Sequence, residues 1–297
     1  MTDQAQPLKA AAWMMGAVFG FSSLAIAGRQ LAQGLDTFEI MTFRSVIGVL
    51  VVLGVATATG KRHHIKATAL HLHFCRNLSH FAGQNLWLFA LTLIPLAQLF
   101  ALEFSYPILV AIGAVVFLGE RINPLRTLSF VIGFIGILIV ARPFGAGGLS
   151  IGLISAMACA FGFAGSALFT KKLTQTAHVT LMSILFWLSL MQMIMGLICA
   201  GFDGDIALPS TQQWPWIAVL SLAGLGAHMC LTKALSLAPA SIVTPIDFLR
   251  LPLIALVGMV FYGEGLDLYV FIGAAIIFGA NYMNILTESR QKHLIKP

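Results

Sequence analysis

The sequence predicts an all-α protein that crosses a membrane ten times, organised as two inverted repeats of five helices. The first observation behind this prediction is composition: 59% of the residues are hydrophobic, 9% are charged, and the mean hydropathy is +0.92. Since about a quarter of the residues in a soluble domain are charged, this chain has too little polar surface to face water on all sides. The second observation is a series of long apolar stretches, and the third is an internal repeat that preserves polar residues.

The apolar stretches are long enough to span a bilayer, because a helix crosses its hydrocarbon core with about 20 apolar residues. Helices are the expected form, since they pair their own backbone polar groups within lipid. The third stretch is the weakest prediction, because polar side chains such as His73 and Asn85 interrupt it. The first has no cleavage pattern, so we expect no cleavable signal peptide. The predicted spans are residues 8–28, 37–59, 70–93, 96–118, 125–142, 149–170, 179–201, 214–237, 240–262 and 267–287.

The internal repeat is clearest between residues 89–120 and 233–264, which lie 144 positions apart. Eleven of the 32 aligned pairs are identical, and the acidic Glu103 aligns with the acidic Asp247. Apolar composition alone does not align one carboxylate with another. We therefore predict a first repeat over residues 1–145, a second over 146–290 and a tail over 291–297. Both repeats close their fourth span on the same dipeptide, formed by Gly119 and Glu120 in one copy and by Gly263 and Glu264 in the other.

An odd number of helices in each repeat requires the second copy to enter the membrane upside down. Inverted repeats are typical of secondary transporters, in which two similar halves give nearly equivalent inward-open and outward-open states. With the N-terminus inside, eleven Lys and Arg residues fall in inner loops and tails, and two, Arg29 and Arg142, fall in outer loops. This bias predicts that both termini are cytoplasmic.

Motifs of several other protein classes are missing. The four cysteines have no CxxC spacing, so we expect reduced thiols and no metal site. The basic residues lack the clustering of a nucleic-acid interface. Neither HExxH, GxSxG nor a nucleotide-binding loop occurs, so we expect neither an enzyme nor a cofactor. A channel stays open as an alternative, although an inverted repeat without a filter sequence favours a carrier.

These features resemble the EamA family of the drug/metabolite transporter superfamily. The likeness rests on the inverted five-helix repeats, the Gly-Glu pairs, Pro95 and Pro239 before the fourth helices, and the Phe43–Arg44 pair. The second half departs from the pattern, because Phe186 stands where the first has Arg44. The resemblance implies a carrier in the bacterial inner membrane, most similar to exporters of neutral or aromatic amino acids. Uptake of S-adenosylmethionine is the alternative. We expect a monomer or weak homodimer.

Ionisable side chains within spans are costly and usually face a partner or a wet cavity. Glu103 lies ~12 Å into its helix and Arg44 ~10 Å into the second, counted from the same side at 1.5 Å per residue. We expect Arg44 to neutralise Glu103. Asp247 has three candidate partners: Arg76, Lys233 and Arg250. Whether such pairs lock helices together or bind substrate is left open.

The third helix is the predicted cavity wall. Asn77, His80 and Gln84 share one helical face, and that face cannot comfortably meet lipid. We expect His80 and Gln84 to line the substrate path together with Tyr106 and His228. The repeat adds Phe19 and Phe161, which occupy corresponding positions of the two halves.

Prolines within the fourth and ninth spans predict bends at corresponding places of the two repeats, because proline removes a backbone hydrogen bond. These residues are Pro107, Pro245 and Pro252, and either a hinge or a static kink fits them. The fifth and tenth spans are rich in small residues, among them Gly136 and Gly273. Small residues favour close helix contact, so these helices form a scaffold edge or meet another subunit.

Overall fold

The computed structural model describes residues 6–118, 124–142, 148–202, 204–237 and 246–295, and the regular elements of these residues are all helical. Helices coincide with the ten predicted spans, except that the fourth span is split in two and the first part of the ninth lies outside the described residues. The elements are α1 (Pro7–Leu31), α2 (Thr37–Ala58), η1 (Arg62–His64), α3 (Leu70–Leu93), α4 (Leu96–Glu103), α5 (Tyr106–Leu118), α6 (Pro124–Ala141), α7 (Ile151–Thr174), α8 (Leu181–Ala200), α9 (Trp214–Leu237), α11 (Arg250–Tyr262) and α12 (Leu268–Ile295).

Seven of these segments are long and apolar enough to cross a membrane, counting α4 and α5 as one. Two shorter apolar helices, within α6 and at α11, accompany them in the described part of the chain. The helix α3 is long enough but carries many polar side chains, as its sequence predicts. The chain is thus an all-helical, multi-pass membrane protein, and the count of ten crossings stays a prediction.

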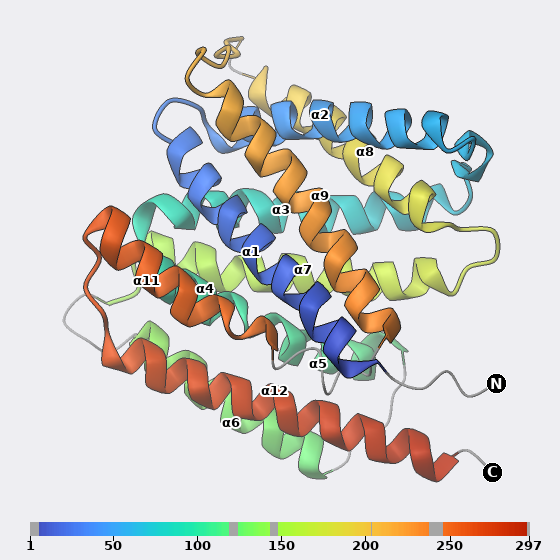
Figure 1. Cartoon of the computed structure of the whole chain (residues 1–297). Coiled ribbons are helices and arrows are strands. Elements are labelled where there is room, and N and C mark those ends of the chain that lie inside the picture. Colours follow the sequence, from blue (N-terminus) through green and yellow to red (C-terminus); the bar gives the residue numbers. More distant parts are fainter. Residues whose placement is uncertain (1–5, 119–123, 143–147, 203, 238–245, 296–297) are drawn as a thin grey trace.

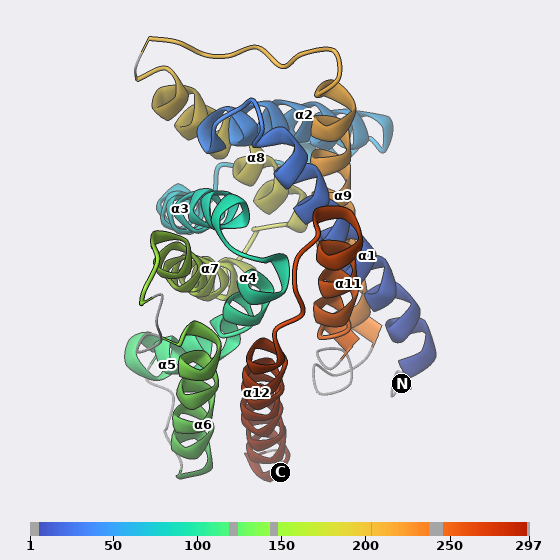
Figure 2. The same ribbon diagram turned by 90° about the vertical axis from the view of Figure 1, so that its left-hand side faces the viewer.

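The helices pack in pairs that join the two halves of the chain. The main pairs are α1 with α9, α3 with α7, α2 with α8, and α6 with α12 (Figures 1 and 2). By the predicted repeat, α1 and α3 correspond to α7 and α9, so the first two pairs are equivalent to each other. The start of α1 and the end of α12 lie at one end of the bundle (Figure 1). We call this the terminal end and the other the opposite end.

Glycines explain the closest helix pairs. A Cβ atom added to Gly162 on α7 would lie 2.6 Å from the Cα atom of Gly83 on α3. Likewise, a Cβ atom on Gly136 would lie 2.9 Å from the carbonyl oxygen of Gly273. Small residues thus let two helix backbones approach closely. Such packing favours helix association in lipid, where the hydrophobic effect does not drive helices together. The α6–α12 pair forms one edge of the bundle (bottom of Figure 2), a position that fits both a scaffold edge and contact with another subunit.

The fourth span breaks between α4 and α5 because of Pro107. This proline is the second residue of α5. In a continuous helix its ring would collide with the carbonyl of Glu103, four residues earlier. The carbonyl of Phe104 instead accepts a hydrogen bond of 2.8 Å from the side-chain amide of Asn281 on α12. In the second half, α11 begins only at Arg250, two residues before Pro252. Pro245 lies outside the described residues.

Candidate functional site

A cavity of about 410 Å³ lies inside the bundle, lined by residues of α1, α3, α4, α5, α7, α9 and α11. Along α3 it extends from the seventh residue, Arg76, to the eighteenth, Trp87, a distance of ~16 Å that leaves ~9 Å of helix beyond each end. The cavity is therefore centred on the middle of this helix, and its volume falls in the range of sites for drug-sized ligands. Its wall is made by Phe21, Leu24, Arg76, His80, Gln84, Trp87, Glu103, Tyr106, Phe163, Ser166, Ala167, Thr170, His228, Leu231, Asp247 and Arg250.

The polar face of α3 meets this cavity as its spacing predicts. His80 and Gln84 lie in the wall, and so do Tyr106 and His228. Asn77 does not: it is fully buried behind the wall, where its amide donates to the carbonyl of Trp187 at 3.0 Å. The shared-face argument thus places two of its three residues in the wall, the separate expectations for Tyr106 and His228 place both there, and the role of all four in substrate binding remains a prediction.

The phenylalanines at corresponding positions of the repeats were assigned to the wrong side of their helices. Phe19 and Phe161 are 56% and 65% exposed on the outside of the bundle, where lipid would cover them. Phe21 and Phe163, two residues further on, line the cavity instead. The glycine between the two phenylalanines of each pair marks the side of the helix that packs against a neighbour. Gly20 lies against α9 and Gly162 against α3, so the phenylalanines before and after each glycine flank that contact, and only the second of each pair faces the cavity.

Two histidines in the wall are held by neighbouring side chains. A nitrogen of the His80 ring, Nδ1, lies 2.7 Å from the Gln192 amide nitrogen on α8. His228 packs edge-on against Phe21, with ring centroids 5.2 Å apart. These contacts orient both rings at the cavity wall.

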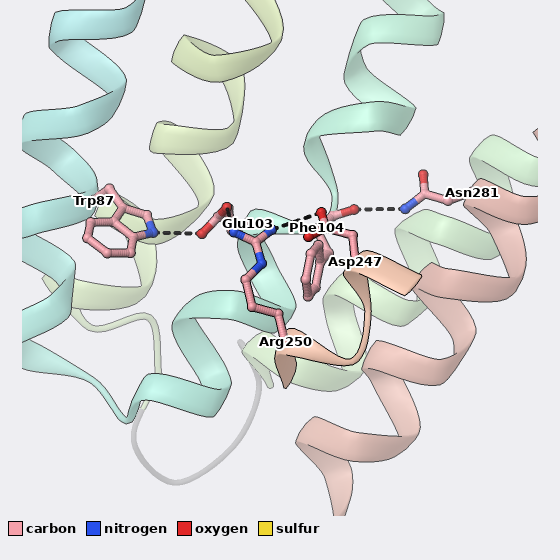
Figure 3. Close-up of polar contacts among 6 residues, drawn as sticks. All are labelled: Trp87, Glu103, Phe104, Asp247, Arg250 and Asn281. Carbon is pink, nitrogen blue, oxygen red and sulfur yellow. Dashed lines mark hydrogen bonds and ion pairs between the residues drawn. The ribbon is translucent and has the colours of Figure 1, made fainter. Parts of the chain in front are cut away.

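A charged cluster of Glu103, Asp247 and Arg250 occupies one end of the cavity (Figure 3). The Arg250 guanidinium lies 3.1 Å from Asp247 and 3.5 Å from Glu103, and the indole N–H of Trp87 donates to Glu103 at 2.7 Å. The guanidinium also lies over three phenylalanine rings, nearest that of Phe21 at 4.8 Å. Two carboxylates at equivalent positions of the repeats thus share one cation. With both ionised, the cluster has an excess negative charge.

The prediction that Arg44 neutralises Glu103 is therefore wrong. The break in the fourth span ends α4 at Glu103, and its carboxylate faces the start of α11, where Arg250 lies one turn beyond Asp247. Arg44 instead contacts the Met41 sulfur at 3.6 Å, beside a small cavity of about 20 Å³. Of the three candidate partners of Asp247, the structure selects Arg250.

The opposite end of the bundle is held by ion pairs. The Glu264 carboxylate pairs with Arg29 of α1 and accepts a hydrogen bond of 2.8 Å from the backbone N–H of Leu96, the first residue of α4. A second pair joins Arg142 to Asp267. The carboxylate of the second Gly-Glu motif thus joins α1, α4 and the segment after α11. The other copy of the motif, Gly119 and Glu120, lies outside the described residues.

The sequence profile of the EamA-like transporter family matches residues 8–142 and again residues 150–286. The chain belongs to this family. Relatives with assigned names include a riboflavin transporter of Rhizobium johnstonii, 30% identical over 95% of this chain and 92% of that protein. Another is an S-adenosylmethionine uptake transporter of Rickettsia conorii, 26% identical over 94% of this chain and 92% of that protein. These EamA relatives are transporters of small metabolites rather than enzymes.

Two further comparisons extend this picture. A pseudopaline exporter of Pseudomonas aeruginosa is 23% identical over 88% of this chain and 90% of that protein. A solved crystal structure superposes with a TM-score of 0.64 at 18% identity and covers 95% of this chain and 98% of its own. That structure supports the fold alone. The names of these relatives do not support the expectation of amino-acid export; the alternative, S-adenosylmethionine uptake, is the activity named for the Rickettsia protein.

Proposed function

We propose that this EamA protein is a secondary carrier for a metabolite that joins a planar aromatic ring system to polar groups, as in flavins and nucleosides. The metabolite binds in the central cavity. The observation that carries the proposal is the cavity itself, because about 410 Å³ with four aromatic residues in its wall suits a larger ligand than a single amino acid. The riboflavin and S-adenosylmethionine relatives transport molecules of this kind.

Alternating access follows from the predicted inverted repeat. In this proposal, the two halves rock around the fixed central site and expose it first to one compartment and then to the other. The Arg29–Glu264 pair closes the opposite end, because it ties α1 to the segment after α11 and, through Leu96, to α4. From the distribution of Lys and Arg, this closed end faces the periplasm and both termini face the cytoplasm of a bacterial cell.

Counterflow in proteoliposomes tests the proposal. Vesicles are loaded with unlabelled riboflavin, S-adenosylmethionine or an amino-acid mixture, and entry of the labelled compound is followed. We expect saturable entry that is accelerated by internal riboflavin or S-adenosylmethionine. Exchange of amino acids alone would restore the narrower expectation of amino-acid transport, and linear, non-saturable entry would support a channel.

A further inference from the structure

Arg76 is a buried arginine with no acidic partner in the described part of the chain. It is 7% exposed and lies in the cavity wall. Its Nε donates to the Thr170 hydroxyl at 3.3 Å, and its Nη1 donates to the Asn77 side-chain oxygen at 2.8 Å. Its Nη2 makes no hydrogen bond to the described residues, and the side chain lines the cavity. A buried guanidinium therefore presents an unused donor to the space where a ligand would lie.

A second arginine adds to the positive charge at this place. Arg44 lines the small cavity together with Gln192, whose amide nitrogen meets the His80 ring, and its Nη1 lies 3.6 Å from the Met41 sulfur. Within the described residues, neither arginine is in an ion pair with a carboxylate, whereas Arg250 has two. Uncompensated charge is costly inside a membrane protein. Buried arginines without a carboxylate partner are expected where a bound ligand supplies the negative charge.

The charges of the cavity are sorted along its length. Arg76 lies near one end, and Trp87, hydrogen-bonded to Glu103, lies ~16 Å further along α3. Between these ends, Phe163 lies beside His80, with ring centroids 5.7 Å apart. The cavity thus has an arginine without an acidic partner among the described residues at one end, and two carboxyl groups that share one guanidinium at the other.

We infer that the transported molecule carries a carboxylate, which binds Arg76, and an aromatic ring system that lies along the cavity from there. This inference rests on the proposed function and narrows its substrate to an aromatic carboxylate. A nucleoside joined to an amino acid has this form, and a neutral flavin does not. Guanidinium and carboxylate make charge-assisted hydrogen bonds, which are the strongest class in proteins.

A matched pair of ligands tests the inference. S-adenosylmethionine and its decarboxylated analogue share the adenosyl, sulfonium and amino groups and differ in the carboxylate. Binding of both is measured by isothermal titration to the full chain in lipid nanodiscs. The wild-type protein is expected to bind the carboxylate form about 10- to 100-fold more tightly, as one or two hydrogen bonds to a charged group provide. Arg76→Gln should abolish this preference, and Arg76→Lys should keep part of it.

Arg62→Gln is the control, because Arg62 is exposed on η1, away from the cavity. It should leave both affinities unchanged. Equal binding of the two ligands by the wild-type protein would overturn the inference, and this comparison needs no variant to fold. A preference that survives Arg76→Gln would overturn it as well. In both cases, saturable counterflow of riboflavin would leave the carrier proposal standing. If the wild-type protein transports neither riboflavin nor S-adenosylmethionine, both proposals are wrong.

Discussion

Replacing Arg250 with Gln should destabilise the protein far more than neutralising either carboxylate beside it. Arg250 is the only cation within 4 Å of Glu103 or Asp247 among the described residues, and all three side chains are at most 15% exposed. Its loss leaves two carboxylates without a charged partner in a water-poor site. Removing one partner of a buried ion pair costs about 3–5 kcal/mol. Glu103→Gln should cost less, because the shorter Arg250–Asp247 contact of 3.1 Å remains.

The assay is thermal unfolding of purified protein in detergent, followed by size-exclusion chromatography with fluorescence detection. Arg250→Gln is expected to lower the midpoint by on the order of 10 °C. The triple variant that also carries Glu103→Gln and Asp247→Asn should recover part of this loss, because it buries no unpaired charge. The reasoning would be refuted if Arg250→Gln melted like the surface variant Arg62→Gln, or if the triple variant were less stable than Arg250→Gln alone.

Other predictions follow from single contacts. Gly162→Ala should destabilise by about 1–3 kcal/mol, because its new Cβ atom would meet the backbone of α3, whereas Gly226→Ala, with open space around it, should be neutral or stabilising; thermal unfolding compares the two. Arg29→Gln should increase labelling of a Ser166→Cys variant by an impermeant thiol reagent applied from the opposite end, because it weakens the closure around Glu264. Arg142→Gln should have a smaller effect, since its ion pair is more exposed, and equal effects would argue against a special role for Glu264. Asn281→Leu should cost about 1–3 kcal/mol in the same unfolding assay, because the Phe104 carbonyl loses its donor, and an unchanged midpoint would contradict this.

The sequence was sufficient for the helices and for much of the cavity wall. Apolar length alone places a membrane helix, so the predicted spans lie within one or two residues of many helix ends. His80 and Gln84 could be assigned because a polar face on one helix must avoid lipid, whichever neighbours it has. The paired carboxylates, Glu103 and Asp247, followed from the repeat itself.

The partners of these residues could not be predicted in the same way. Depth along a helix does not say which neighbour a side chain faces, and in the structure Arg44 and Arg250 line different cavities. The choice between them depends on the break at Pro107, which turns α5 away from α4. The same holds for Phe19 and Phe21. Both match phenylalanines of the second repeat, and this match does not say which of the two faces the cavity.

Accessibility of the cavity from each face of the membrane tests the central claim most directly. A Ser166→Cys variant, with the four native cysteines replaced, is reconstituted and labelled with an impermeant reagent from either side. An alternating-access carrier predicts labelling from both compartments, with protection from both by a transported substrate. Labelling from one compartment alone, unchanged by any substrate that the protein transports, would contradict the account.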